Sequence, residues 1–151
     1  MSTDVVIVSA ARSPIGRANK GSLKDFRPDD LAALVVRAAL DKVPALDPGT
    51  VDDVYLGCGL PGGESGFNMG RIVNVLNGMD DVPGATLTRY CASSVQTTRM
   101  AFHAIKAGEG DTFLVGGVEC VSQYTSFAGA GGSDAEAQNP RFADAAARSA
   151  E

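Results

Sequence analysis

Hydrophobic residues follow two spacings along this chain: short continuous apolar runs, and apolar positions three or four residues apart. Continuous runs rich in β-branched residues are typical of strands that are buried on both faces of a parallel sheet. Such runs predict four strands, at Val5–Val8, Val54–Leu56, Ala85–Tyr90 and Thr112–Val115. Strands that alternate with helices indicate βαβ units, so we expect an α/β fold with a mainly parallel sheet covered by helices.

Three helices are predicted between these strands by the i, i+3, i+4, i+7 spacing. The first begins at Pro28 and runs to about Lys42, the second ends at Asn77-Gly78, and the third begins near Cys91 and ends before Gly108. The residues expected to face the sheet are Leu31, Leu34, Val35 and Ala38 in the first helix, Met69, Ile72, Val73 and Leu76 in the second, and Val95, Phe102 and Ile105 in the third.

The last part of the chain differs in composition from the rest. From Ser126 onward the sequence is rich in Ala, Gly and polar residues, and it has little apolar face. We therefore expect one α/β domain over residues 1–125 and a loop, linker or disordered tail over residues 126–151. The α/β fold is expected to be incomplete at its C-terminal end.

Composition narrows the class of protein. The 151 residues are 44% hydrophobic and 21% charged, which is typical of one globular unit. A net charge of -5 without a basic run argues against a nucleic-acid partner. The apolar stretch Val5–Ala11 is too short to span a membrane and lacks the charged region of a signal peptide, so a cytoplasmic location is expected. Three cysteines without CxxC spacing argue against a disulfide framework and a structural zinc site, and no bound metal is expected.

Cys91 is the candidate nucleophile. It lies where a predicted strand gives way to a helix, so its thiol is at the positive end of the helix dipole, and Ala92, Ser93 and Ser94 leave room for a substrate. The alternative, a small buried apolar residue, is equally consistent with position alone. For Cys58 and Cys120, close packing is the better explanation.

His103 is the only histidine, and it cannot serve as the base for Cys91. Twelve residues along one helix correspond to about 18 Å, whereas a base must come within about 3 Å of its proton. A general base for Cys91 must therefore come from another chain or from sequence outside these residues.

The segment Gly57–Gly62 matches the GxGxxG pattern of dinucleotide-binding loops. Four further residues, including Glu64, lengthen this loop before the next helix, and Glu64 would place negative charge beside a phosphate. The acids Asp80 and Asp81 also precede the next strand instead of ending it. A glycine-rich loop shaped for backbone packing or subunit contact is the favoured interpretation.

Four ordered segments resemble successive signatures of the thiolase family, most closely its degradative 3-ketoacyl-CoA thiolase and acetyl-CoA acetyltransferase branch. They are Val8–Gly16, Gly57–Asn68, Arg89–Ser94 and Gly116–Ser122. Four motifs in order are far more specific than any one of them. Residues 126–151 resemble the start of the family's inserted loop domain, and ketoacyl synthases are a lesser alternative.

The resemblance implies an acyltransferase of fatty acid degradation. Cys91 matches the family's nucleophile, which cleaves a 3-oxoacyl-CoA with CoA to give acetyl-CoA and a shortened acyl-CoA, or condenses two acetyl-CoA in reverse. The Cys91 N–H would form part of an oxyanion hole. A coenzyme A thioester is then the substrate, with no permanently bound cofactor. The resemblance also places the Gly57–Asn68 loop near a subunit interface and implies a homo-oligomer for the complete enzyme.

Several parts of the family pattern are missing from these residues. The resemblance implies a second α/β half that supplies a histidine, an asparagine-containing oxyanion motif and a second cysteine, and neither Cys58 nor Cys120 matches that cysteine. We therefore expect the 151-residue chain to be inactive alone. It is a fragment of a longer enzyme, half of a split enzyme, or a non-catalytic binding or structural subunit.

Overall fold

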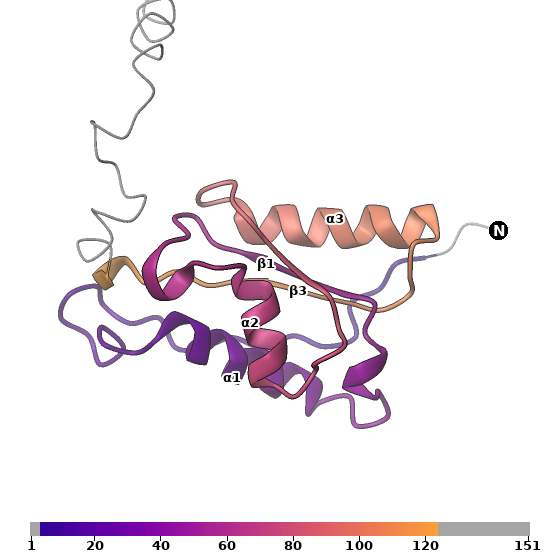
Figure 1. The fold of residues 1–151 in the computed structure, drawn as a ribbon, viewed down its shortest axis with the longest axis horizontal. Helices are drawn as coiled ribbons and strands as arrows, with labels where there is room; N and C mark the ends of the chain where they lie inside the picture. Colours follow the sequence, from indigo (N-terminus) through magenta and orange to yellow (C-terminus); the bar gives the residue numbers. More distant parts are fainter. Residues whose placement is uncertain (1–3, 124–151) are drawn as a thin grey trace, which may run out of the picture.

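The computed structural model describes residues 4–123, and the tail expected over residues 126–151 lies outside them (Figure 1). Three α-helices and three strands make up this part of the chain. In order they are α1 (Pro28–Leu40), β1 (Asp53–Gly57), α2 (Met69–Leu76), β2 (Gly84–Leu87), α3 (Ser93–Ala107) and β3 (Phe113–Gly117). Two short 3₁₀ turns, η1 (Pro48–Thr50) and η2 (Gly63–Ser65), lie in the connections.

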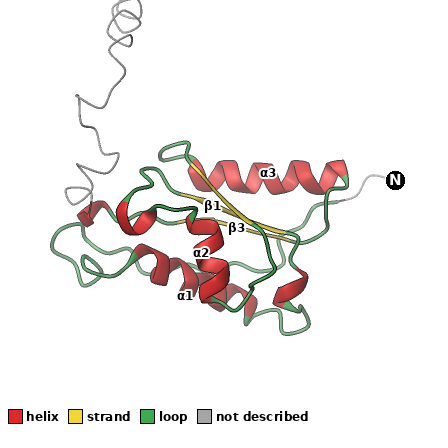
Figure 2. Cartoon of the chain, in the orientation of Figure 1, coloured by secondary structure: helices red, strands yellow, loops and turns green. Residues whose placement is uncertain are grey.

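The sheet is parallel, with the strand order β2-β1-β3. Val54 of β1 is paired with Gly84 on one side and with Leu114 on the other. Helices α1 and α2 cover one face, and α3 covers the opposite face (Figure 2). The predicted α/β fold with a helix-covered parallel sheet is confirmed. No helix within residues 4–123 is long and apolar enough to cross a bilayer.

The hydrophobic core lies between the sheet and the α1–α2 layer. Val54 and Leu56 are two residues apart on β1, so both side chains point to this face, and both are buried. They belong to two neighbouring clusters of buried residues: Leu40, Val51, Val54, Met79 and Val82 in one, and Ala32, Leu56, Met69 and Val73 in the other. This core holds β1 rigidly, and the residues that follow β1 are therefore held in place as well.

The opposite face of the sheet is packed by small residues, which the sequence pattern did not predict. The buried side chains of α3 are Ser93, Thr97, Ala101 and Ala104. Val95 and Phe102 of the predicted apolar face are 71% and 44% exposed. The reason lies in the strands beneath, because a Cβ on Gly117 would come within 3.0 Å of the Ser94 side chain. Where the backbones come this close, only small side chains fit between the layers.

The predicted strand Val5–Val8 is wrong. Val6, Ile7 and Val8 are 71%, 81% and 74% exposed, and the segment pairs with no strand within residues 4–123. Its β-branched residues favour an extended backbone, but a strand also needs a hydrogen-bonded neighbour. Both sides of β1, the central strand, are occupied by β2 and β3, and within residues 4–123 the segment also pairs with neither outer edge of the sheet.

Smaller corrections concern element ends and helix faces. Strand β2 ends at Leu87 instead of Tyr90, and α1 ends at Leu40 instead of Lys42. Of the predicted faces, Met69 and Val73 are buried in α2, whereas Leu34 of α1 is 58% exposed and Leu76 of α2 is 50% exposed. The face of α1 that packs inward is shifted to Ala32, Val36 and Leu40.

Candidate functional site

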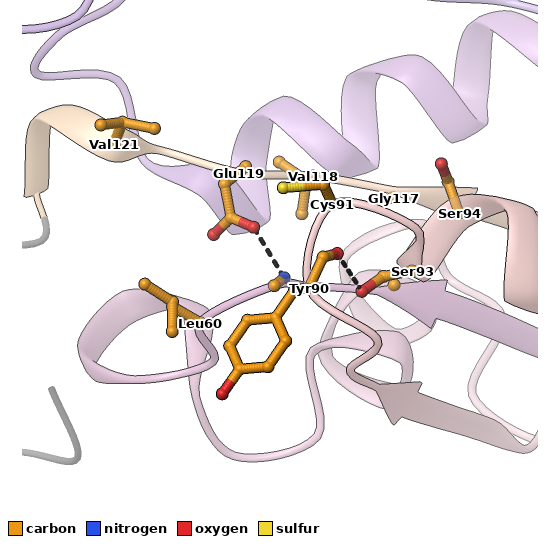
Figure 3. Close-up of a pocket in the computed structure, with 11 residues that line it drawn as sticks. Leu60, Tyr90, Cys91, Ser93, Ser94, Gly117, Val118, Glu119 and Val121 are labelled. Carbon is orange, nitrogen blue, oxygen red and sulfur yellow. Dashed lines mark hydrogen bonds between the residues drawn. The ribbon is translucent and has the colours of Figure 1, made fainter. Parts of the chain in front are cut away.

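A hollow of about 540 Å³ lies beyond the carboxyl ends of β1 and β3 (Figure 3). Ligand sites of parallel α/β sheets occupy this edge, because the loops that leave neighbouring strands meet there. The hollow draws on three loops, one after β1, one between β2 and α3, and one after β3. Its lining residues are Gly57, Gly59, Leu60, Tyr90, Cys91, Ser93, Ser94, Gly117, Val118, Glu119 and Val121.

Cys91 lies in this hollow, two residues before the start of α3, and it is exposed. Its side chain points toward the part of the hollow where Glu119 lies (Figure 3). The expectation that Cys91 follows a strand and precedes a helix is therefore confirmed, and its thiol is exposed instead of buried. Its role as a nucleophile stays a prediction.

A strained turn presents Cys91. Tyr90 has a φ of 48°, in the left-handed region that a bulky residue adopts only when its surroundings enforce it. Ser93 provides that constraint, because its hydroxyl accepts the Arg89 N–H at 2.8 Å and donates to the Tyr90 carbonyl at 2.6 Å. A backbone hydrogen bond of 3.1 Å from the Ser93 N–H to the same carbonyl closes the turn.

The turn leaves the Cys91 N–H without a hydrogen-bond acceptor among residues 4–123. This N–H lies next to the first turn of α3, where the helix dipole favours negative charge. An N–H in this position can stabilise an anionic oxygen that develops on a bound substrate. The local geometry thus combines an exposed thiol with a donor suited to an oxyanion.

Glu119 was not singled out from the sequence, yet it joins two loops of the site. It follows β3, and its Oε2 accepts the N–H of Gly59, which follows β1, at 2.6 Å. Its Oε1 accepts a longer hydrogen bond, of 3.6 Å, from the thiol of Cys58. The available sequence signal was its place four residues after the predicted strand Thr112–Val115, at the same edge of the sheet as Cys91.

Cys58 is unsuited to act as a nucleophile. It is 1% exposed, and burial, together with the neighbouring Glu119 carboxylate, raises the pKa of its thiol to about 11. Cys120 is half-buried and does not line the hollow. The packing interpretation of Cys58 is therefore supported, and Cys91 is the one cysteine at the site among residues 4–123.

The loop Gly57–Asn68 is shaped by packing and lacks the geometry of a dinucleotide site. Helix α2 begins only at Met69, and the three-residue 3₁₀ turn η2 intervenes, so no α-helix opens from the glycine motif. Glu64 is paired with Arg27 at 2.7 Å, which ties the loop to the start of α1. A Cβ on Gly59 would stand 2.5 Å from Glu119 Oε2, so the glycine serves a close contact within the protein.

His103 lies on α3, exposed, with its ring 5.7 Å from that of Phe102. Ten residues of helix separate it from Ser93, which corresponds to about 15 Å along the axis. The exclusion of His103 as a base is consistent with this placement. Among residues 4–123, no group of three or more side chains is suited to hold a metal ion.

Comparison with known proteins identifies relatives over most of the chain. The family model described as the thiolase N-terminal domain matches residues 5–149. The 3-ketoacyl-CoA thiolase of Bacillus subtilis is 43% identical over 121 residues, which are 80% of this chain and 31% of that protein. The β-ketoadipyl-CoA thiolase of Pseudomonas knackmussii is 45% identical over 124 residues, 82% of this chain and 31% of that protein.

A solved structure agrees with these matches. The crystal structure of the Bacillus anthracis acetyl-CoA acetyltransferase superposes with a TM-score of 0.68 at 34% sequence identity, covering 74% of this chain and 28% of that one. The chain thus spans about a third of the length of the curated relatives that it matches.

Proposed function

Because this chain belongs to the thiolase family, we propose that it supplies the nucleophile of a thiolase-type acyltransferase, and that Cys91 is this nucleophile. The observation that carries the proposal is the exposed Cys91 thiol in the hollow at the carboxyl edge of the sheet, held by a strained turn at the start of α3. An exposed thiol beside a backbone N–H donor is accessible to an electrophilic substrate.

In the proposed reaction the Cys91 thiolate attacks the keto carbon of a 3-oxoacyl-CoA. The bond between this carbon and C2 breaks, the electron pair leaves with C2, and protonation of C2 gives acetyl-CoA. The shortened acyl group remains on Cys91 as a thioester. The thiolate of a second CoA then attacks this thioester, restores the Cys91 thiolate and releases the shortened acyl-CoA. Covalent catalysis divides the carbon–carbon cleavage into two easier steps, and the reverse sequence condenses two acetyl-CoA.

Two features near Cys91 support this assignment. The Cys91 N–H, without an acceptor among residues 4–123, is suited to bind the oxyanion of the tetrahedral intermediate. The Ser93 hydroxyl, bonded on both sides of the turn, holds the backbone that carries the sulfur and this N–H. Fixed donors of this kind need no reorganisation during the reaction, which is the source of their effect.

We propose that the groups that move protons come from outside these 151 residues, from a second α/β half or a partner chain. His103 lies too far along α3, and Cys58, with a raised pKa, is no substitute for a second catalytic cysteine. The isolated chain is then expected to carry the attacking sulfur without completing turnover.

Alkylation of the three cysteines tests the proposal. The native chain is treated with iodoacetamide at neutral pH, and the labelling rate of each cysteine is followed by peptide mass spectrometry. Cys91 should react at least about tenfold faster than Cys120, and Cys58 should be the slowest, because exposure and thiolate character set the rate. A Cys91→Ser variant is the matched control, because the labelled peptide that disappears in it is the one that carries Cys91. Equal labelling of all three cysteines in the folded chain would contradict the proposal and favour a non-catalytic subunit.

A further inference from the structure

We propose that Glu119 is a positioning residue for Cys91, acting through the backbone of Gly59 and the side chain of Thr88. The inference rests on the proposed role of Cys91 as the nucleophile. It begins from a carboxylate that lines the same hollow as the thiol and whose two oxygens both accept hydrogen bonds from the loop after β1.

The contact between Glu119 and Gly59 is short and specific. Gly59 is buried, and its N–H donates a part-buried hydrogen bond of 2.6 Å to Glu119 Oε2. Hydrogen bonds from a backbone N–H to a carboxylate are among the stronger ones in proteins. Removing the acceptor would leave a buried donor unsatisfied, so the loop after β1 would have to move. Glu119 therefore fixes where Gly59 lies.

Gly59 in turn is connected to the turn that presents Cys91. Its carbonyl accepts a hydrogen bond of 2.7 Å from the Thr88 hydroxyl. The same hydroxyl oxygen accepts the N–H of Tyr90, at 3.4 Å. Tyr90 is the residue with the left-handed backbone directly before Cys91. One continuous series of hydrogen bonds thus runs from the carboxylate to the strained turn, across loops that follow β3, β1 and β2.

The negative charge of Glu119 allows a second, independent test of its place beside Cys91. It is the only carboxylate among the residues that line the hollow, and Arg and Lys are absent from this lining. A reagent that enters the hollow to reach Cys91 therefore passes the Glu119 carboxylate, whose charge is weakly screened over short distances. Removing this charge should favour anionic reagents at Cys91 relative to neutral ones.

The test compares Glu119→Ala and Glu119→Gln in the full chain. Labelling by iodoacetamide, which is neutral, and by iodoacetate, which is an anion, is measured at Cys91, with Cys120 of the same molecule as the reference. Glu119→Ala should slow iodoacetamide labelling of Cys91 about fivefold because the buried Gly59 N–H loses its acceptor. Glu119→Gln should stay within about twofold of the parent because its amide oxygen can still accept this N–H. Glu109→Gln, at the far end of α3, is the matched control.

Both variants should raise the ratio of iodoacetate to iodoacetamide labelling at Cys91, by about threefold at low salt, and leave the ratio at Cys120 unchanged. Unslowed iodoacetamide labelling of Cys91 in a folded Glu119→Ala chain would overturn the inference. If the Ala variant does not fold, Thr88→Val, which breaks the same series at the Gly59 carbonyl, decides it: unslowed labelling of Cys91 there would overturn it as well. Failure of the proposed function gives a different result from failure of this inference. In that case the parent chain itself would show no preferential labelling of Cys91.

Discussion

A Cβ atom on Gly57 would lie 2.7 Å from the Cβ of Ser93, so β1 and the first turn of α3 meet at a distance that only glycine allows. Gly57 ends β1, and Ser93 both begins α3 and holds the turn before Cys91. The depth at which α3 sits on the sheet, and with it the position of the thiol, therefore depends on one missing side chain.

We expect Gly57→Ala to lower the free energy of unfolding by about 1–3 kcal/mol, because a methyl group must push α3 away from β1. It should also slow the alkylation of Cys91. Gly116→Ala is the matched control, since its Cβ would meet nothing nearer than 3.8 Å. Urea denaturation measures both variants. If both variants lose the same unfolding free energy, the close contact between Gly57 and Ser93 does not determine how well α3 packs on β1.

The turn before Cys91 gives a second prediction. Tyr90 is 71% exposed, so little packing is lost when it is replaced. The stability of a variant at this position should therefore depend mainly on how well the new residue adopts a φ of 48°. Tyr90→Gly should keep the turn, because glycine adopts this backbone freely, whereas the β-branched Tyr90→Val should destabilise it by roughly 1–3 kcal/mol. The glycine variant should have a higher melting temperature and faster Cys91 alkylation than the valine variant. The reverse ranking would contradict the strained-turn description.

The Thr88 hydroxyl links Gly59 to Tyr90, and we expect its removal to affect the alkylation of Cys91. Thr88→Val keeps the shape but loses the hydrogen bond to the Gly59 carbonyl, and we expect a loss of about 1 kcal/mol in unfolding free energy together with slower Cys91 alkylation. Thr98→Val is the control, because the Thr98 hydroxyl, on the exposed side of α3, donates to the Ser94 carbonyl and is not part of the series through Gly59. If Thr98→Val slows Cys91 as much as Thr88→Val does, the link through Gly59 is wrong.

The pKa of Cys58 predicts a dependence of stability on pH. The native thiol has a pKa raised to about 11 from the ordinary 9.0, so the unfolded chain releases this proton first. The stabilisation is complete below pH 9 and is lost as the pH rises toward 11. One such proton changes the unfolding free energy by at most about 1.4 kcal/mol per pH unit.

Urea denaturation of the parent and Cys58→Ala between pH 8 and pH 11 measures this contribution. The slope against pH should be smaller in the variant, while any constant difference reports packing alone. Parallel curves across this range would mean that the Cys58 thiol titrates alike in the folded and unfolded chains.

Much of the layout is local and was predicted from the sequence. Strand β1, helix α2 and the start of α1 follow from apolar spacing and from first-turn Pro28, because these signals lie within single elements. Local sequence signals also predicted the position of Cys91 between a strand and a helix. The exclusion of His103 as its base likewise needed only the geometry of one helix. The four ordered motifs also placed the chain in its family before any contact was known.

The tertiary structure decided what depends on partners far apart in the chain. Val5–Val8 has the composition of a strand but pairs with neither edge strand, β2 or β3, within residues 4–123, because composition does not decide which segments come to lie side by side. The buried face of α3 consists of small residues because the glycines of β1 and β3 bring the backbones together. Glu119 meets Gly59 only because parallel strands bring their carboxyl ends to one edge of the sheet. Apolar spacing reports which positions prefer burial, whereas close approach and hydrogen bonding between loops are set by the packing of distant elements.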